Sequence, residues 1–216
     1  MKLITVEQME AATERLLENG RQVGADSWQQ RVKNQTPHCK FGEEGVCCRI
    51  CSMGPCRVTP KAPRGICGCD VHGIVARNYL RFTAGGAATH SDHGRSICHT
   101  LYQTKEGGNY TVKDPEKLKR IAGEWGIATE GKDIYDLAHE VAETALMEYG
   151  KPFGLQRFLS RAPEHTQKLW HDAGIEPRAI DREVSQSLHM THMGCSSLPE
   201  ALIRQSLRAG LCDGWG

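Results

Sequence analysis

The sequence predicts an all-α protein in which helices surround one irregular, cysteine-rich loop. Three observations support this fold class. Apolar residues recur at helical spacing through most of the chain, with glycine or proline where a helical series begins or ends. No stretch alternates strictly between apolar and polar residues, as a half-buried strand would. Seven of the ten cysteines fall between Cys39 and Cys69, where the sequence shows no periodicity. The expected architecture is therefore a helical, bundle-like domain with a loop that something other than an apolar core must organise.

The first helix is expected between Thr5 and Gly20. Thr5 and Gln8 have the spacing of a capping box, in which each side chain satisfies a backbone N–H at the start of a helix. Gly20 is typical of a helix end, because glycine tolerates the left-handed conformation found there. Met9 and Leu16 belong to the apolar face that these signals enclose.

Helices resume after the cysteine-rich loop. One is expected over Val71–Phe82, with Gly85 and Gly86 as an interruption, and a second apolar series runs through Ile97 to Leu101. Aspartate, serine or proline opens each later helix and glycine ends it, which is the usual asymmetry of helix ends. These later helices are expected over Asp114–Gly126, Asp133–Gly150, Pro163–Gly174, Pro177–Gly194 and Ser197–Gly210.

Composition excludes several classes of protein. The chain has 216 residues, of which 39% are apolar and 25% charged, as in an ordinary globular protein. A net charge of +1 gives no electrostatic reason to expect nucleic-acid binding. No run approaches eighteen apolar residues, so no membrane-spanning helix is expected, and no signal peptide is recognised. We therefore expect a cytoplasmic protein, in which dense cysteines indicate metal more often than disulfides.

Four cysteines have the spacing of an iron–sulfur site. Cys48, Cys51 and Cys56 are separated by two and four residues, and Cys67 follows after ten more. Three close thiolates and a distant fourth are the usual ligands of a cubane 4Fe–4S cluster. The surrounding segment carries five Lys or Arg against two acids, and cationic surroundings favour a negatively charged cluster. Its five glycines also allow backbone amides to approach the sulfurs.

A structural zinc site is the alternative, since zinc also accepts four thiolates. Zinc sites usually pair two Cys-x-x-Cys knuckles, however, and this segment has only one. The adjacent Cys47 and Cys48 are also awkward for one tetrahedral ion, because neighbouring side chains in extended backbone point to opposite sides. Cys47 could instead join Cys39 in a second centre, whose missing ligands come from an identical chain across a two-fold axis. The spacing equally allows Cys39 and Cys47 to be unligated buried thiols.

The chain resembles a known family through several strings in a fixed order. They are CCRICSMGPCRV, RGICG, IVARNYLRFTAGGAATHSDHGR, RAPEHTQKLW, DREVSQSLHMTHMG and DGWG. Together they are similar to the N-terminal region of the anaerobic, nickel-containing carbon monoxide dehydrogenases, over nearly the whole chain from about residue 35. Hybrid-cluster, hydroxylamine reductase-like proteins are relatives of this family. The Cys47–Cys48 doublet and the string MGPCR favour carbon monoxide dehydrogenase over them.

The resemblance implies particular ligands and partners. The four spaced cysteines match the ligands of an internal 4Fe–4S cluster, and Cys39 and Cys47 match those of a cluster shared across a homodimer. Cys69 stands where the family usually has a small residue and is not assigned as a ligand. The family oxidises CO with water to CO2, two protons and two electrons, and passes the electrons through these clusters to a ferredoxin-like acceptor.

The same resemblance places the ligands of the nickel–iron–sulfur cluster in later domains. We therefore expect this chain to be a fragment or one piece of a split enzyme, inactive alone, with the catalytic cluster on a further polypeptide. The domains expected are an N-terminal helix and arm at 1–38, a cluster-binding loop at 39–70 and a truncated helical domain at 71–216. The alternatives are a stand-alone iron–sulfur carrier or scaffold subunit, a hybrid-cluster-like protein and a zinc-stabilised helical module.

Three histidines fit a proton relay in the family. His90, His93 and His99 match relay positions, although Ser96 stands where the family commonly has another histidine. Without the resemblance, such histidines would more often be ordinary surface or core residues. The isolated Cys98, Cys195 and Cys212 are expected to be buried, inert thiols, because free cysteine is among the most buried residue types.

Overall fold

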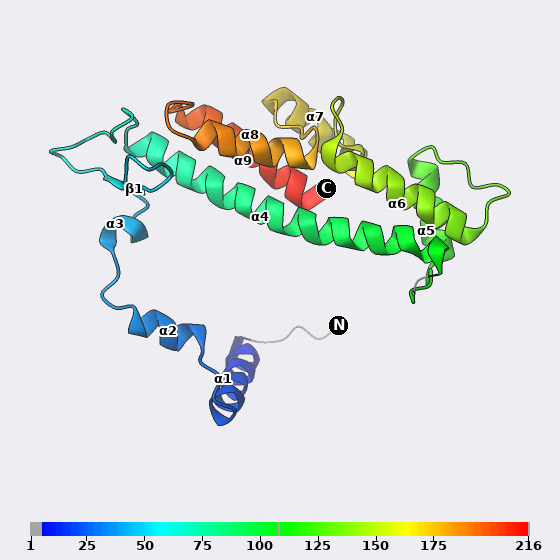
Figure 1. The fold of residues 1–216 in the computed structure, drawn as a ribbon, viewed down its shortest axis with the longest axis horizontal. Helices are drawn as coiled ribbons and strands as arrows, with labels where there is room; N and C mark the ends of the chain where they lie inside the picture. Colours follow the sequence, from blue (N-terminus) through cyan, green and yellow to red (C-terminus); the bar gives the residue numbers. More distant parts are fainter. Residues whose placement is uncertain (1–5, 108, 216) are drawn as a thin grey trace. The chain divides into compact units, whose positions relative to one another are not determined.

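The computed structural model describes residues 6–107 and 109–215. Backbone contacts divide the chain into two compact units, Met1–Glu44 and Gly45–Gly216. The described residues form helices and two very short strands (Figure 1), which confirms the all-α prediction. No helix of the described ranges combines the length and apolar character needed to span a membrane. The predicted division at residues 38 and 70 stays a prediction.

The described part of the first unit is helical, and its described side chains form no buried core. Its helices are α1 (Val6–Gln22), α2 (Trp28–Asn34) and α3 (Lys40–Glu43). The predicted end of α1 at Gly20 is wrong, because the helix continues to Gln22, and Thr5 of the predicted capping box lies outside the described residues. None of the residues from 9 to 44 is buried.

The second unit is built along one long helix, α4 (Val71–Tyr102), drawn in green in Figure 1. Helix α4 packs against three other helices, and two of those, α8 and α9, also pack on each other. Ala76 and Leu80 of α4 form an apolar cluster with Leu202 of α9. The remaining elements are α5 (Pro115–Glu124), α6 (Ile134–Gly150), α7 (Glu164–Ala173), α8 (Ile180–Thr191), α9 (Pro199–Trp215) and the 3-10 turns η1 (Gln103–Glu106) and η2 (Arg157–Arg161).

The expected interruption at Gly85 and Gly86 is wrong. Helix α4 runs through both glycines without a break. A glycine costs a helix only about 1 kcal/mol relative to alanine. Ala84 and Ala87 beside the glycines are each 1% exposed, so burial of this face offsets the cost.

The other helix ends follow their capping residues to different degrees. Asp114 and Asp133 cap α5 and α6 by accepting hydrogen bonds from backbone amides, and Gly174 ends α7 in the left-handed conformation, as predicted. The predicted limits of the last two helices are wrong. Helix α8 is shorter than 177–194 at both ends, whereas α9 continues past Gly210.

The cysteine-rich segment lies at the N-terminal end of α4. It contains a small antiparallel hairpin of β1 (Cys47–Cys48) and β2 (Cys56–Arg57). Of residues 45–70, all of them described, only Cys69 is buried. Asn78 of α4 donates to the carbonyls of Gly45 and Cys47 at 3.0 and 2.9 Å, and β1 contacts α4. The segment therefore rests on α4 and has no core of its own.

Candidate metal centre

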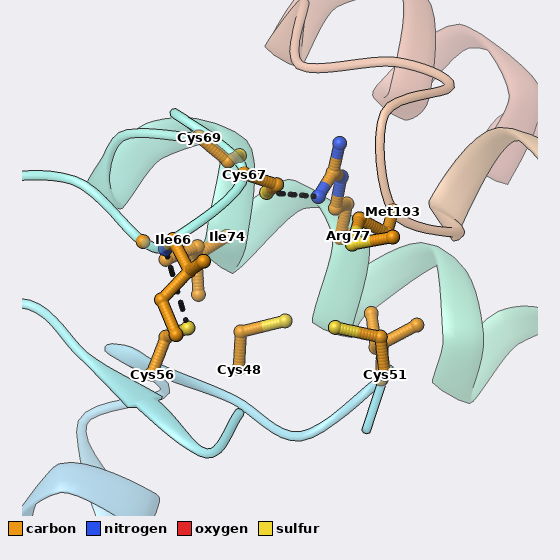
Figure 2. Close-up of a pocket in the computed structure, with 11 residues that line it drawn as sticks. Cys48, Cys51, Cys56, Ile66, Cys67, Cys69, Ile74, Arg77 and Met193 are labelled. Carbon is orange, nitrogen blue, oxygen red and sulfur yellow. Dashed lines mark hydrogen bonds between the residues drawn. The ribbon is translucent and has the colours of Figure 1, made fainter. Parts of the chain in front are cut away.

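Five cysteines line a single cavity between the loop and α4. They are Cys48, Cys51, Cys56, Cys67 and Cys69, and Figure 2 shows them together. The other residues that line the cavity are mostly apolar: Ile50, Gly65, Ile66, Ile74, Arg77 and Met193. The four predicted ligands of the internal cluster thus converge on one place.

The hairpin separates the two members of the cysteine doublet. Cys48 pairs with Cys56 across the strands and Cys47 pairs with Arg57. Directly paired residues share a face of the hairpin, whereas neighbours along a strand point to opposite faces. Accordingly Cys48 and Cys56 line the cavity and Cys47 does not. This arrangement is the one that the doublet predicted.

Two glycines allow the loop to close around the cavity. A Cβ on Gly54 would lie 3.1 Å from both the Cys48 carbonyl oxygen and the Cys56 nitrogen. A Cβ on Gly65 would lie 3.5 Å from the Cys56 sulfur, and the next residue, Ile66, donates its backbone N–H to that sulfur at 3.4 Å. The glycines therefore bring backbone close to a candidate ligand, as the sequence indicated.

A buried arginine supplies positive charge at the cavity. Arg77 of α4 is 2% exposed, and its Nη1 donates to the Cys67 sulfur at 3.5 Å (dashed in Figure 2). Its Nε donates to the Ser196 carbonyl at 2.7 Å, and Nη2 donates to the same oxygen. One guanidinium therefore connects a candidate ligand to the segment between α8 and α9.

The thiols of Cys67 and Cys69, the two upper cysteines in Figure 2, differ in acidity. The backbone N–H of Cys69 and, more weakly, the Arg77 guanidinium lower the pKa of the Cys67 thiol. Burial raises the pKa of the Cys69 thiol. Hydrogen bonds to a sulfur favour its thiolate, the form that binds metal. The Cys67 sulfur therefore favours the thiolate form more than the Cys69 sulfur does.

The donor set fits a group larger than one metal ion. Around a single zinc, with Zn–S bonds of about 2.3 Å, the thiolates lie within about 4 Å of one another. Cysteines spread around an apolar cavity, with N–H donors aimed at two sulfurs, suit an iron–sulfur cluster.

The remaining predicted ligands and relay residues lie elsewhere. Cys39 is exposed and precedes α3 in the first unit, while Cys47 is half-buried in β1 of the second. His90, His93 and His99 are all exposed on α4. His90 Nδ1 lies 2.7 Å from Asp213 Oδ1 of α9. None of these positions is part of the five-cysteine cavity.

The isolated cysteines partly contradict their predicted burial. Cys212 is 1% exposed, which confirms its predicted burial, and that burial raises the pKa of its thiol to about 12. Cys98 is half-buried beside Tyr149, and burial raises its pKa as well. Cys195 is exposed, so its predicted burial is wrong. It follows α8 in a turn, where no helix covers it.

Sequence reasoning left the role of Arg77 undecided. The residue belongs to a helical series and has no special spacing to the cysteines. Only packing of the loop on α4 brings its guanidinium to Cys67. A local signal did exist, since an arginine on the buried face of a helix needs partners for its charge.

Known proteins similar to this chain agree on one family. The model of the "Prismane/CO dehydrogenase family" matches residues 46–216. Carbon monoxide dehydrogenase 1 of Methanosarcina mazei is 43% identical over 213 residues, which cover 96% of this chain and 34% of the relative. The chain thus spans about a third of the length of this relative.

Solved structures are similar in the same way. The Ni-free carbon monoxide dehydrogenase of Thermococcus sp. AM4 matches with a TM-score of 0.86 and 44% identity, over 93% of this chain and 33% of that one. A structure of acetyl-CoA synthase/carbon monoxide dehydrogenase, described with NiZn[Fe4S4] and NiNi[Fe4S4] clusters in its alpha subunits, matches with a TM-score of 0.83 and 35% identity, over 92% and 31% of the two chains.

Proposed function

Because this chain belongs to the Prismane/CO dehydrogenase family, we propose that it is the electron-transfer, N-terminal part of a carbon monoxide dehydrogenase. The observation that carries the proposal is the cavity lined by five cysteines and a buried arginine. Cys48, Cys51, Cys56 and Cys67 hold an internal 4Fe–4S cluster there. Such a cluster, when bound, accepts and releases one electron at a time.

The chain's own residues tune and protect this site. Ile50 and Ile74 form apolar lining beside the sulfurs, while Ile66 and Arg77 donate hydrogen bonds to those of Cys56 and Cys67. Donated hydrogen bonds and a nearby positive charge stabilise the more negative, reduced state of a cluster. Their combined effect is a higher reduction potential than a bare loop would give.

The second proposed site uses Cys39 and Cys47 of each of two identical chains. Two thiolates per chain are too few for a cubane, and a two-fold axis presents each of them twice. Cys47 has the matching property of facing away from the internal cavity. The functional unit is then a homodimer, in the cytoplasm, that gives electrons to a ferredoxin-like acceptor.

We place the nickel–iron–sulfur site in the part of the relatives that these 216 residues do not cover. The exposed His90, His93 and His99 would carry protons once that part covers α4, with Ser96 interrupting the histidine series. The names of the relatives favour this function over a hybrid-cluster protein.

The isolated chain should not oxidise CO. Purified anaerobically and supplied with nickel, it should give no CO-dependent reduction of a viologen dye, because it lacks the catalytic ligands. As a control, the dithionite-reduced and desalted chain should still reduce the oxidised dye, which shows that its clusters exchange electrons. Steady CO-dependent dye reduction by the pure chain would contradict the proposal that the catalytic cluster lies outside these 216 residues.

Removing the charge of Arg77 should lower the reduction potential of the internal cluster. Arg77→Gln keeps a donor for the Ser196 carbonyl but loses the cation near Cys67. Coulomb's law at an effective dielectric constant of about 20 gives a change on the order of 100 mV. A potentiometric titration followed by electron paramagnetic resonance measures it.

Two further variants separate charge from packing. Arg77→Lys retains the charge and should shift the potential less than Arg77→Gln. Arg81 lies one turn later on α4 and donates to Thr191 and Leu188 of α8, outside the cavity. Arg81→Gln should therefore leave the potential unchanged. An unaltered potential in Arg77→Gln with the cluster intact contradicts the assigned role.

A further inference from the structure

The cavity contains one thiol more than the proposed cluster uses. A cubane cluster takes four thiolates, and five cysteines line the cavity. The fifth, Cys69, is 1% exposed, whereas Cys67 is exposed. Cys195 and Cys212 lie outside the cavity lining, and Cys47 is on the opposite face of the hairpin. Cys69 is therefore the spare thiol of this site.

One tight turn delivers both Cys67 and Cys69 to the cavity. The Gly65 N–H donates to the Cys69 carbonyl at 2.8 Å, and the Gly68 N–H donates to the Gly65 carbonyl at 2.9 Å. Gly68 between the two cysteines has a φ of 87°, which a residue with a side chain rarely adopts. The turn thus places two thiols, separated by one glycine, at the same wall of the cavity.

Helix α4 leaves room for the Cys69 side chain. A Cβ on Gly73 would lie 2.5 Å from the Cys69 sulfur, so the sulfur occupies space that any other residue at 73 would fill. The Asp70 carboxylate, which accepts from the Gly73 N–H at 2.9 Å, fixes the start of α4 beside it. Arg77, which donates to Cys67, also acts electrostatically on Cys69.

We propose that Cys69 is a reserve ligand of the internal site, which binds the iron at the Cys67 corner of a 4Fe–4S cluster when Cys67 does not. The inference rests on the proposed function, in which this cavity holds a cluster. In the exchange, the Fe–S bond to Cys67 breaks and one to Cys69 forms. The Cys69 thiol releases its proton as it binds, and the departing Cys67 thiolate takes one up, so the oxidation state of the cluster is unchanged.

The exposure of Cys67 to oxidants explains why a reserve ligand would be useful. Oxidants reach an exposed thiolate before a buried one. Cys67 is the most accessible of the four proposed ligands, since Cys48, Cys51 and Cys56 are half-buried. The buried Cys69 thiol, two residues away, therefore protects the cluster at its Cys67 ligand, the one that oxidants reach first.

The test counts iron in variants of the full 216-residue chain. A Cys39→Ser, Cys47→Ser background leaves the internal cluster as the iron to be counted. In it, Cys67→Ala should keep close to the parent's iron, about four atoms per chain, because Cys69 takes the corner. Adding Cys69→Ala should reduce the content to about three iron atoms or fewer. Cys56→Ala is the matched control and should lose iron, since no spare thiol stands beside it.

Alanine removes the side-chain donor at position 67 altogether, so a retained cluster points to Cys69. Far-ultraviolet circular dichroism shows whether each variant retains its helices. Equal iron loss in Cys67→Ala and in the Cys67→Ala, Cys69→Ala pair, with the helices intact, overturns the inference. So does loss of the cluster from Cys69→Ala alone, which would make Cys69 a primary ligand. A parent without iron would instead contradict the proposed function.

A second measurement needs no change at the primary ligands. An iron chelator should remove iron from Cys69→Ala several-fold faster than from the parent. When Cys67 dissociates from its iron in this variant, no second thiol is present to bind that iron. Equal rates of removal overturn the inference even where Cys67→Ala does not fold. Cys195→Ala, an exposed cysteine outside the cavity, should match the parent rate.

Discussion

Replacing Cys51 by serine should remove the internal cluster and unfold the loop while the helices remain. In Figure 2 the sulfurs of Cys48 and Cys51 are directed toward each other across the cavity floor. Of residues 45–70, only Cys69 is buried, so in the proposed site a bound cluster would take the place of a core in this segment. Where a metal group organises a segment, its binding free energy is also folding free energy. The loss of one ligand should therefore destabilise the folded conformation of the whole loop.

Two readouts follow the loop and the helices separately. Both are measured in the Cys39→Ser, Cys47→Ser background, in which only the internal cluster contributes colour. There, visible absorbance should fall to near zero in Cys51→Ser, and limited proteolysis should cut within 45–70. The far-ultraviolet circular dichroism should stay close to that of the wild type, since α4, α8 and α9 have their own apolar contacts. Cys195→Ser, at an exposed position outside the cavity, should behave as the wild type. A Cys51→Ser protein that keeps its colour contradicts the ligand assignment.

The second large effect is expected on assembly. A Cys39→Ser, Cys47→Ser double variant should keep the internal cluster and lose the shared one. Each chain loses both of the ligands it supplies, so all four thiolates of the shared centre are removed, and the binding free energy of that centre contributes to dimerisation. The dimer should then dissociate at least about tenfold more readily, which corresponds to about 1.4 kcal/mol. Apolar contacts between the chains would retain part of the affinity.

Light scattering and iron counting on the same anaerobic samples decide this prediction. The wild type should be a homodimer with more iron per chain than the double variant. Cys195→Ser again serves as the control for an exposed cysteine. A monomeric wild type with full internal iron, or a double variant that retains all the wild-type iron, would contradict the shared cluster.

The sequence predicted most of the helices because their end signals are local. Asp114 and Asp133 accept hydrogen bonds at the starts of α5 and α6, and these bonds need no other part of the chain. The continuity of α4 could not be predicted in this way. Its glycines are unfavourable locally, and the burial of Ala84 and Ala87 that offsets them depends on how α4 packs against helices later in the chain.

For the candidate site as well, features set by the local backbone were predictable and those set by tertiary packing were not. Extended backbone alone separates Cys47 from Cys48, so the doublet indicated two faces before the hairpin was seen. The contribution of Arg77 depends on tertiary structure, because its guanidinium meets Cys67 and Ser196 only after the loop and the α8–α9 segment pack on α4. The exposure of Cys195 was missed for a similar reason, since burial of a single cysteine depends on what covers it.

The central claim is that the five-cysteine cavity holds an iron–sulfur cluster. Its most direct test is the iron, acid-labile sulfide and zinc content of the Cys39→Ser, Cys47→Ser chain, expressed and purified without oxygen. The account predicts a brown protein with about four iron and four sulfide per chain and no stoichiometric zinc. A colourless protein with one zinc per chain and no sulfide would contradict it.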